Sequence, residues 1–217
     1  MSWGEVYKIN SNMRKPLNEQ IQSIKCLPIR LITASTTFTP EKTGVYKVIC
    51  VGAGAAGYAY KTTNSGNTVF SSGGGSGGVA VKVLTLNSGT KYNVSIGTSA
   101  SFGNIMTTTG GTTAIYYISD GAIYSTGGTA TGGDYNFAGA AGESSYATSG
   151  TFKGASVNVW FTELTPIPTT IDGLTTGDGV LRYGGGGSAS RTAYNSVNSG
   201  VAGQPAAVII IPLEMEE

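Results

Sequence analysis

Residues 45–57 read Val-Tyr-Lys-Val-Ile-Cys-Val-Gly-Ala-Gly-Ala-Ala-Gly, an apolar run that leads directly into a glycine cluster. The run is rich in β-branched and aromatic residues, which are enriched in β-strands. The same alternation recurs along the chain, and all but two of the 34 glycines lie after residue 51. A flexible glycine linker carries no such runs. The sequence therefore predicts a folded, all-β, glycine-rich domain in which glycine lets backbones approach one another closely.

Apolar runs bounded by glycine, proline and polar residues mark the expected strands. These are residues 35–40, 45–51, 79–86, 92–96, 113–119, 156–163 and 207–212, with a turn at residues 42–44. The Ser/Thr/Gly stretches between them leave open whether the chain forms strands there or threefold extended segments packed side by side, as in polyglycine II. We expect the core to include Val48, Val81, Val83, Val159 and Ile210.

The composition changes near residue 35, so we expect an N-terminal segment, residues 1–35, ahead of a β-domain, residues 36–217. Pro16 suits the first turn of a helix, and Leu17, Ile21 and Ile24 follow as one apolar stripe. A helix of about ten residues is not stable alone. The stripe either packs on the β-domain or docks on a partner or a second copy. We expect the second, which makes this an α-helical attachment and oligomerisation segment.

The overall composition excludes several classes of function. The chain has no histidine, which excludes histidine-based catalysis and histidine metal sites. Its formal net charge of +1 provides no positive electrostatic field that would attract the phosphates of a nucleic acid. We expect no cofactor and no metal. The first ten residues lack the pattern of a signal peptide, and no run approaches the ~20 apolar residues of a membrane span. We therefore expect synthesis in the cytoplasm without membrane insertion. Whether Cys26 and Cys50 pair stays open.

Gly52, Gly54 and Gly57 form a G-x-G-x-x-G pattern after a strand, which is the fingerprint of dinucleotide binding. That function needs a helix that begins within the glycines and holds the pyrophosphate at its N-terminus. Residues 58–67 have no helical period, and Gly77 stands where an acidic residue should bind the ribose. We expect no cofactor at this pattern.

Several segments, in their order, carry a resemblance to a known family. Phe38-Thr-Pro is followed by residues 43–54, Thr-Gly-Val-Tyr-Lys-Val-Ile-Cys-Val-Gly-Ala-Gly, and then by residues 77–97. Later come Gly132-Gly-Asp-Tyr-Asn136, the cluster at residues 183–187 and the apolar final run at residues 203–211. Over about residues 35–213 this order resembles the glycine-rich domain of bacteriophage tail-fibre and adhesin proteins. Residues 13–20, Met-Arg-Lys-Pro-Leu-Asn-Glu-Gln, look like a short fibre-attachment region.

The resemblance implies a tail-fibre tip on a phage or a phage-tail-like particle. Such a tip binds a glycan or protein receptor on the bacterial surface and contacts other tail proteins. Fibre tips are commonly trimeric, so we expect a homotrimer with inter-chain or tail contacts through Leu17, Ile21 and Ile24. Aromatic side chains in the glycine-punctuated stretches, which we expect to be loops, are the candidate receptor contacts: Tyr58, Tyr60, Phe70, Tyr124, Tyr135, Phe137, Tyr146 and Tyr194.

Two other classes of function remain as alternatives. A purely structural tail or baseplate protein would have the same composition without a receptor. A glycan hydrolase needs paired carboxylates. The acids of the β-domain are Asp120, Asp134, Glu143, Glu163, Asp172 and Asp178, and they form no recognisable pair. Asp134 is expected to cap its own Gly-Gly turn. We therefore expect no enzyme.

Overall fold

The computed structural model describes residues 27–61, 69–113, 115–117, 122–142, 144–146, 151–152, 183–187, 189–190, 197–198 and 202–215. These residues are all-β and contain no helix, so the predicted fold class is confirmed for them. The expected N-terminal helix with Leu17, Ile21 and Ile24 lies outside the described residues, as do the expected strand at residues 156–163 with Val159, and Tyr194.

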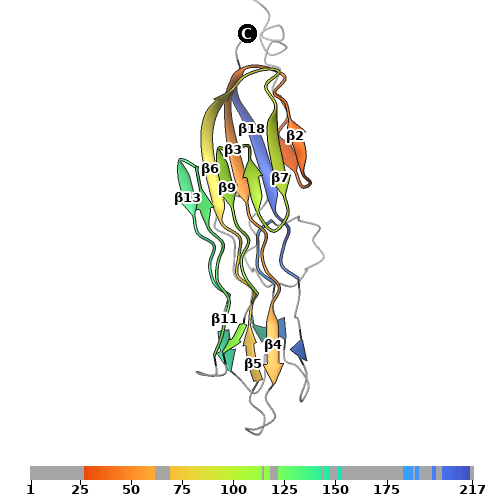
Figure 1. Ribbon diagram of the computed structural model, residues 1–217, viewed down its shortest axis with the longest axis vertical. Helices are drawn as coiled ribbons and strands as arrows, with labels where there is room; N and C mark the ends of the chain where they lie inside the picture. The colour runs from red at the N-terminus through yellow and green to blue at the C-terminus, as the bar shows by residue number, and fades with distance from the viewer. Residues whose placement is uncertain are drawn as a thin grey trace, which may run out of the picture.

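The molecule is elongated and has three levels along its long axis (Figure 1). A β-sandwich forms one end, extended glycine-rich segments run side by side through the middle, and short strands form the other end. The chain passes repeatedly from one end to the other. Each level is therefore assembled from segments that are distant in sequence.

The first layer of the sandwich is an antiparallel five-stranded sheet, sheet A, in the order β1-β18-β3-β6-β13. Its strands are β1 Arg30–Ile32, β18 Ala207–Met215, β3 Gly44–Val51, β6 Val79–Leu86 and β13 Tyr135–Phe137. The three long central strands are the apolar runs expected from the sequence. β18 extends further than predicted, and a β-bulge between Pro212 and Glu214 lets it continue past the proline.

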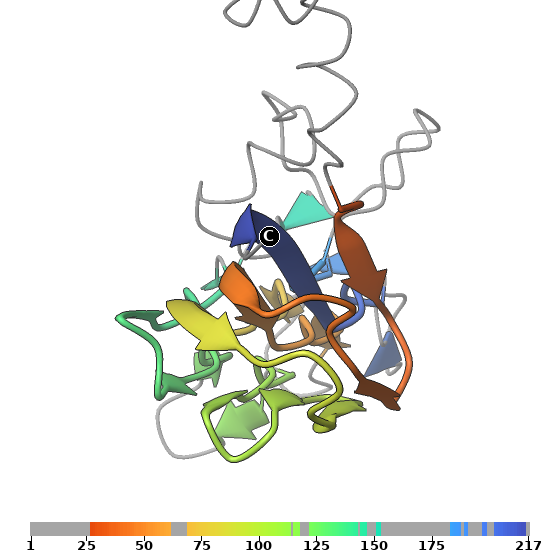
Figure 2. The same cartoon turned by 90° about the horizontal axis from the view of Figure 1, so that it is seen from above.

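The second layer, sheet B, is also antiparallel and has the order β12-β9-β8-β7-β2. Its strands are β12 Ala130–Thr131, β9 Met106–Thr108, β8 Ala100–Phe102, β7 Tyr92–Ile96 and β2 Thr36–Phe38. In Figure 2 the blue, orange and yellow strands of sheet A lie on one side of the yellow-green strands of sheet B. The two layers are those of a β-sandwich.

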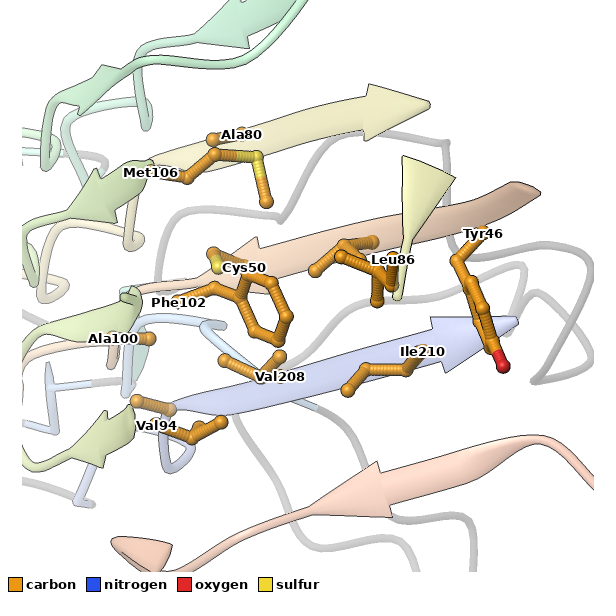
Figure 3. Close-up of a cluster of buried hydrophobic side chains, with 12 residues drawn as sticks. Tyr46, Cys50, Ala80, Leu86, Val94, Ala100, Phe102, Met106, Val208 and Ile210 are labelled. Atoms are coloured by element: carbon orange, nitrogen blue, oxygen red, sulfur yellow. The ribbon is translucent and has the colours of Figure 1, made fainter. Parts of the chain in front are cut away.

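The main core lies between these two layers (Figure 3). Alternate residues of the central strands of sheet A, including Cys50, Val208 and Ile210, point toward sheet B and form one cluster with its Phe102 and Met106. Phe102 is fully buried and stacks on Tyr92, with ring centroids 5.2 Å apart. Cys50 is a free thiol whose pKa is raised to about 12 by burial. It therefore acts as a small apolar side chain.

A second apolar cluster covers the outer face of sheet A. Ile49, Val81, Ile209 and Tyr183 belong to it, and burial raises the pKa of the Tyr183 hydroxyl. The predicted core positions Val48, Val81 and Ile210 are confirmed as buried. The prediction for Val83 is wrong, because its side chain is 48% exposed. Val83 lies on the same outer face as Val81, but nearer the end of β6, beyond this cluster.

The middle level is held together by backbone hydrogen bonds that follow a period of three. In residues 73–78, the amides of Gly74 and Gly77 donate to carbonyls of residues 183–187, and those of Gly75 and Gly78 donate to carbonyls of residues 109–113. The intervening amide of Ser76 donates to Ala140. Successive N–H groups therefore point in three directions, toward different neighbouring segments. In a β-strand they alternate between two directions only.

Glycine is required here because the neighbouring backbones leave no room for a Cβ. A Cβ on Gly74 would collide with the carbonyl of Ala55, and one on Gly75 with the carbonyl of Thr126. Residues 73–78 are buried along their whole length. The segment is thus the centre of a bundle whose interior is backbone.

Short strands form the end opposite the sandwich. A four-stranded sheet, sheet C, has the order β14-β5-β4-β17, with β14 Ser144–Tyr146, β5 Val69–Ser72, β4 Tyr58–Lys61 and β17 Val197–Asn198. Two further pairs are β10 Ile115–Tyr117 with β11 Ala122–Tyr124, and β15 Thr151–Phe152 with β16 Ala189–Ser190. The strand expected at residues 113–119 is confirmed at residues 115–117, where β10 pairs with β11.

The G-x-G-x-x-G pattern has an extended structure. Residues 52–57 run through the middle level without a helix and lead into β4. The amides of Gly52 and Ala55 donate to the carbonyls of Gly78 and Gly75. The glycines of the pattern therefore serve backbone packing, as their context in the sequence predicts.

Candidate binding surface

The register of sheet C brings three of the candidate aromatic residues into one row. Tyr60 lies opposite Phe70, and Phe70 lies opposite Tyr146. On its other side Tyr60 lies opposite Val197. Directly opposed residues share one face of an antiparallel sheet, so we call positions Tyr146, Phe70, Tyr60 and Val197 the aromatic row. The row crosses all four strands at the end of the molecule that lies furthest from the sandwich (Figure 1).

Two further candidates lie at this end. Tyr58 is two residues before Tyr60 in β4, at a position on the same face as the aromatic row. Tyr124 ends β11, which lies beside β5 and β14. Figure 1 shows β11, β5 and β4 together at this end. Five of the eight candidates are therefore gathered at one end of the molecule.

Tyr135 and Phe137 lie elsewhere, in the edge strand β13 of sheet A. They are opposite Val81 and Val79, and Phe137 packs against the second apolar cluster. Tyr135 is 65% exposed. The middle level separates both residues from the aromatic row (Figure 1). The candidates thus form two groups, and Tyr194 lies outside the described residues.

The expectation that these aromatic residues occupy loops is wrong for the seven that the structure describes, because all lie in strands. A signal for the β4–β5 hairpin was present in the sequence. Tyr58-Ala-Tyr60 and Val69-Phe70 are β-prone runs that flank a polar stretch, Thr62-Thr-Asn-Ser-Gly-Asn-Thr68. Two such runs around a glycine-containing polar segment are typical of a hairpin.

Asp134 has a structural role that differs from the expected cap. Its carboxylate oxygens accept hydrogen bonds from the Lys82 ammonium and the Val83 amide, each at 2.9 Å. The Val83 hydrogen bond, with Lys82, lowers the pKa of the Asp134 carboxyl. The turn itself is closed by Asn136, whose side chain accepts from the Gly133 amide and donates to the Gly133 carbonyl. Asp134 therefore ties the 132–136 turn to β6.

The other acids of the β-domain that were considered for catalysis lie outside the described residues: Asp120, Glu143, Glu163, Asp172 and Asp178. No group of three or more histidine, cysteine, aspartate or glutamate side chains in this part of the chain could hold a metal ion. A hollow of about 320 Å³ lies at the sandwich end. It is lined by Arg30, Phe38, Tyr46 and Pro212 among others, with Arg30 paired to Glu41 at 3.0 Å. No helix among the residues described is long and apolar enough to cross a membrane.

Comparison with known proteins adds no assignment. The chain matches no protein-family model. No curated protein sequence matches it either.

Proposed function

We propose that this protein is the tip of a tail fibre, on a phage or a phage-tail-like particle, and that it binds the bacterial cell surface through the aromatic row. The observation that supports this is the position of the row. It lies at one end of an elongated molecule, while Leu27, the first described residue, lies at the sandwich, the opposite end. A recognition surface held away from its point of attachment suits an adhesive tip.

We also infer that the middle level is a polyglycine-II-type bundle that acts as a rigid spacer. Three hydrogen-bond directions, repeated every third residue, support this because such a chain has three residues per turn. The amides and carbonyls satisfy one another there. The spacer needs no large apolar core, which agrees with a chain rich in glycine.

The ligand of the aromatic row is a glycan or protein of the bacterial surface. Tyrosine and phenylalanine offer flat contact area that loses little conformational entropy on binding. The chain carries a formal net charge of only +1, so recognition depends on shape and apolar contact. The protein acts as part of a particle, with residues 1–35 as its attachment segment and a homotrimer as its assembly through Leu17, Ile21 and Ile24.

The proposal is tested by adsorption of the purified protein to susceptible cells, beside a thermal melt. Tyr60→Ala and Tyr146→Ala should each weaken adsorption by about 1–3 kcal/mol, the range for contact residues. Tyr135→Ala is the matched control, because this exposed tyrosine lies away from the row. If both row variants adsorb like the wild type while remaining folded, the protein is a structural tail or baseplate component without a receptor.

A further inference from the structure

An apolar patch at the sandwich end has no cover among the described residues. It consists of Ile29 and Leu31 at β1 with Ile211 and Leu213 of β18, and we call it the β1/β18 patch. Leu31 lies opposite Ile209, and Arg30 lies opposite Ile210. Ile29 precedes Arg30, and Ile211 follows Ile210, at the end of this pairing. Ile29, Leu31 and Leu213 are 48%, 49% and 51% exposed.

Leu31 and Ile211 of the patch lie on the outer face of sheet A, away from the main core, and Leu213 lies at the β-bulge between Pro212 and Glu214. Ile32 packs against the core between the sheets, and successive residues of a strand point to opposite faces. Leu31 therefore faces outward, and Ile29, which directly precedes β1, is exposed. β1 is also an edge strand of sheet A, so the patch continues to the rim of the sheet. An apolar surface at a sheet edge is normally covered by another element.

The chain itself supplies an element that fits this surface. Leu17, Ile21 and Ile24 form the apolar stripe expected in residues 16–24. Basic residues accompany the stripe, namely Arg14, Lys15 and Lys25. The exposed Glu214 of β18 lies next to Leu213, and Glu216 and Glu217 follow in the sequence. The segment also carries Glu19, and Lys47 lies opposite Ile211 at the patch. Both surfaces therefore offer apolar groups together with charges of both signs.

We propose that the β1/β18 patch of each copy receives the Leu17/Ile21/Ile24 stripe of a second copy, so that the chains assemble by exchanging their N-terminal segments. This inference rests on the proposed function, because it names the surface through which the fibre tip oligomerises. Assembly would bury the apolar stripe against a patch that the described residues leave exposed. The exchange also places the segment where it can connect the tip to other tail proteins.

The short connection between stripe and patch favours exchange over docking within one chain. Only Lys25 to Pro28 separate Ile24 from Ile29. Pro28 keeps the residue before it extended, and the chain leads directly into β1. For its own stripe to cover the patch, the chain must reverse direction within these four residues. Short hinges of this kind promote domain swapping.

The experiment is sedimentation of the full-length chain over a range of concentrations, with a reducing agent present so that Cys26 forms no cross-link. The wild type should be an oligomer. Leu31→Gln with Leu213→Gln should raise the dissociation constant at least tenfold. Val83→Gln is the matched control, because Val83 is 48% exposed on the same sheet and lies outside the patch. It should assemble like the wild type.

A second variant leaves both surfaces intact. Ten Gly/Ser residues inserted between Cys26 and Leu27 give each chain enough length to place its own stripe on its own patch, so this variant should become a monomer. The proposal is overturned if the wild type is a monomer. It is also overturned if the insertion variant remains fully assembled, or if the patch variant sediments like Val83→Gln. Adsorption of the Tyr60 and Tyr146 variants tests the receptor function separately, because the aromatic row lies at the other end.

Discussion

Single residues in this protein are constrained mainly by neighbouring backbone, as Gly75 illustrates. Gly75→Ala should lower the free energy of unfolding by about 1–3 kcal/mol, the cost of overpacking, because its Cβ would meet the Thr126 carbonyl. Gly97→Ala is the control, since a Cβ there meets nothing within 4 Å. It should change stability by less than about 0.5 kcal/mol. Thermal melts of both variants give the comparison, and equal losses would contradict a backbone-filled interior.

Asp134, another single residue, makes a pH-dependent contribution to the stability of the folded protein. Its pKa is lower in the folded protein than in the unfolded chain. Its stabilisation is therefore present above the unfolded pKa of about 3.9 and is lost as the pH falls through the folded value. Asp134→Asn should lower the melting temperature at pH 7, and the difference from the wild type should shrink as the pH falls below about 3.9. If the melting temperatures of the variant and the wild type differ as much in acid as at pH 7, the lost stability comes from a changed turn and not from the carboxylate charge.

At the scale of elements, the glycine segments should be as protected as the long strands. The amides of Gly74, Ser76 and Gly77 each donate to another segment at 3.0 Å or less. We expect their hydrogen exchange to be as slow as that of Val48 to Val51, because both open only when several segments separate. Exchange measured by NMR would show this. Rates close to those of an unstructured peptide would exclude a cooperative bundle.

The same scale shows what the sequence could and could not predict. The runs at residues 45–51, 79–86 and 207–212 carry enough β-branched side chains to identify the central strands of sheet A. The prediction that Val83 is buried is wrong because Val83 and Val81 occupy the same face of β6. The sequence does not show that the second apolar cluster covers Val81 and ends before Val83. The sequence could not predict which segments contact Gly75, or that Tyr60 lies opposite Phe70 in sheet C. Both depend on which distant segments meet, and glycine carries no side chain that specifies a partner.

For the whole molecule, low charge predicts that adsorption is insensitive to salt. The chain has a formal net charge of +1 and only 12% charged residues, so little of the binding free energy is Coulombic. Between about 50 and 500 mM salt, across which the Debye length shortens several-fold, adsorption should change less than about twofold. Titration of cell binding at several salt concentrations tests this. A tenfold loss at high salt would indicate that charged groups carry recognition.

The direction of the segments has a mechanical consequence. In the sandwich and in the middle level the chain runs along the long axis of the molecule (Figure 1), and hydrogen bonds between antiparallel strands lie across the strands. A pull between the receptor end and the attachment end therefore loads these bonds in shear, so that many must break together. Under the drag of a particle moving past a cell, the tip should yield at its contacts with the receptor before its own structure unravels.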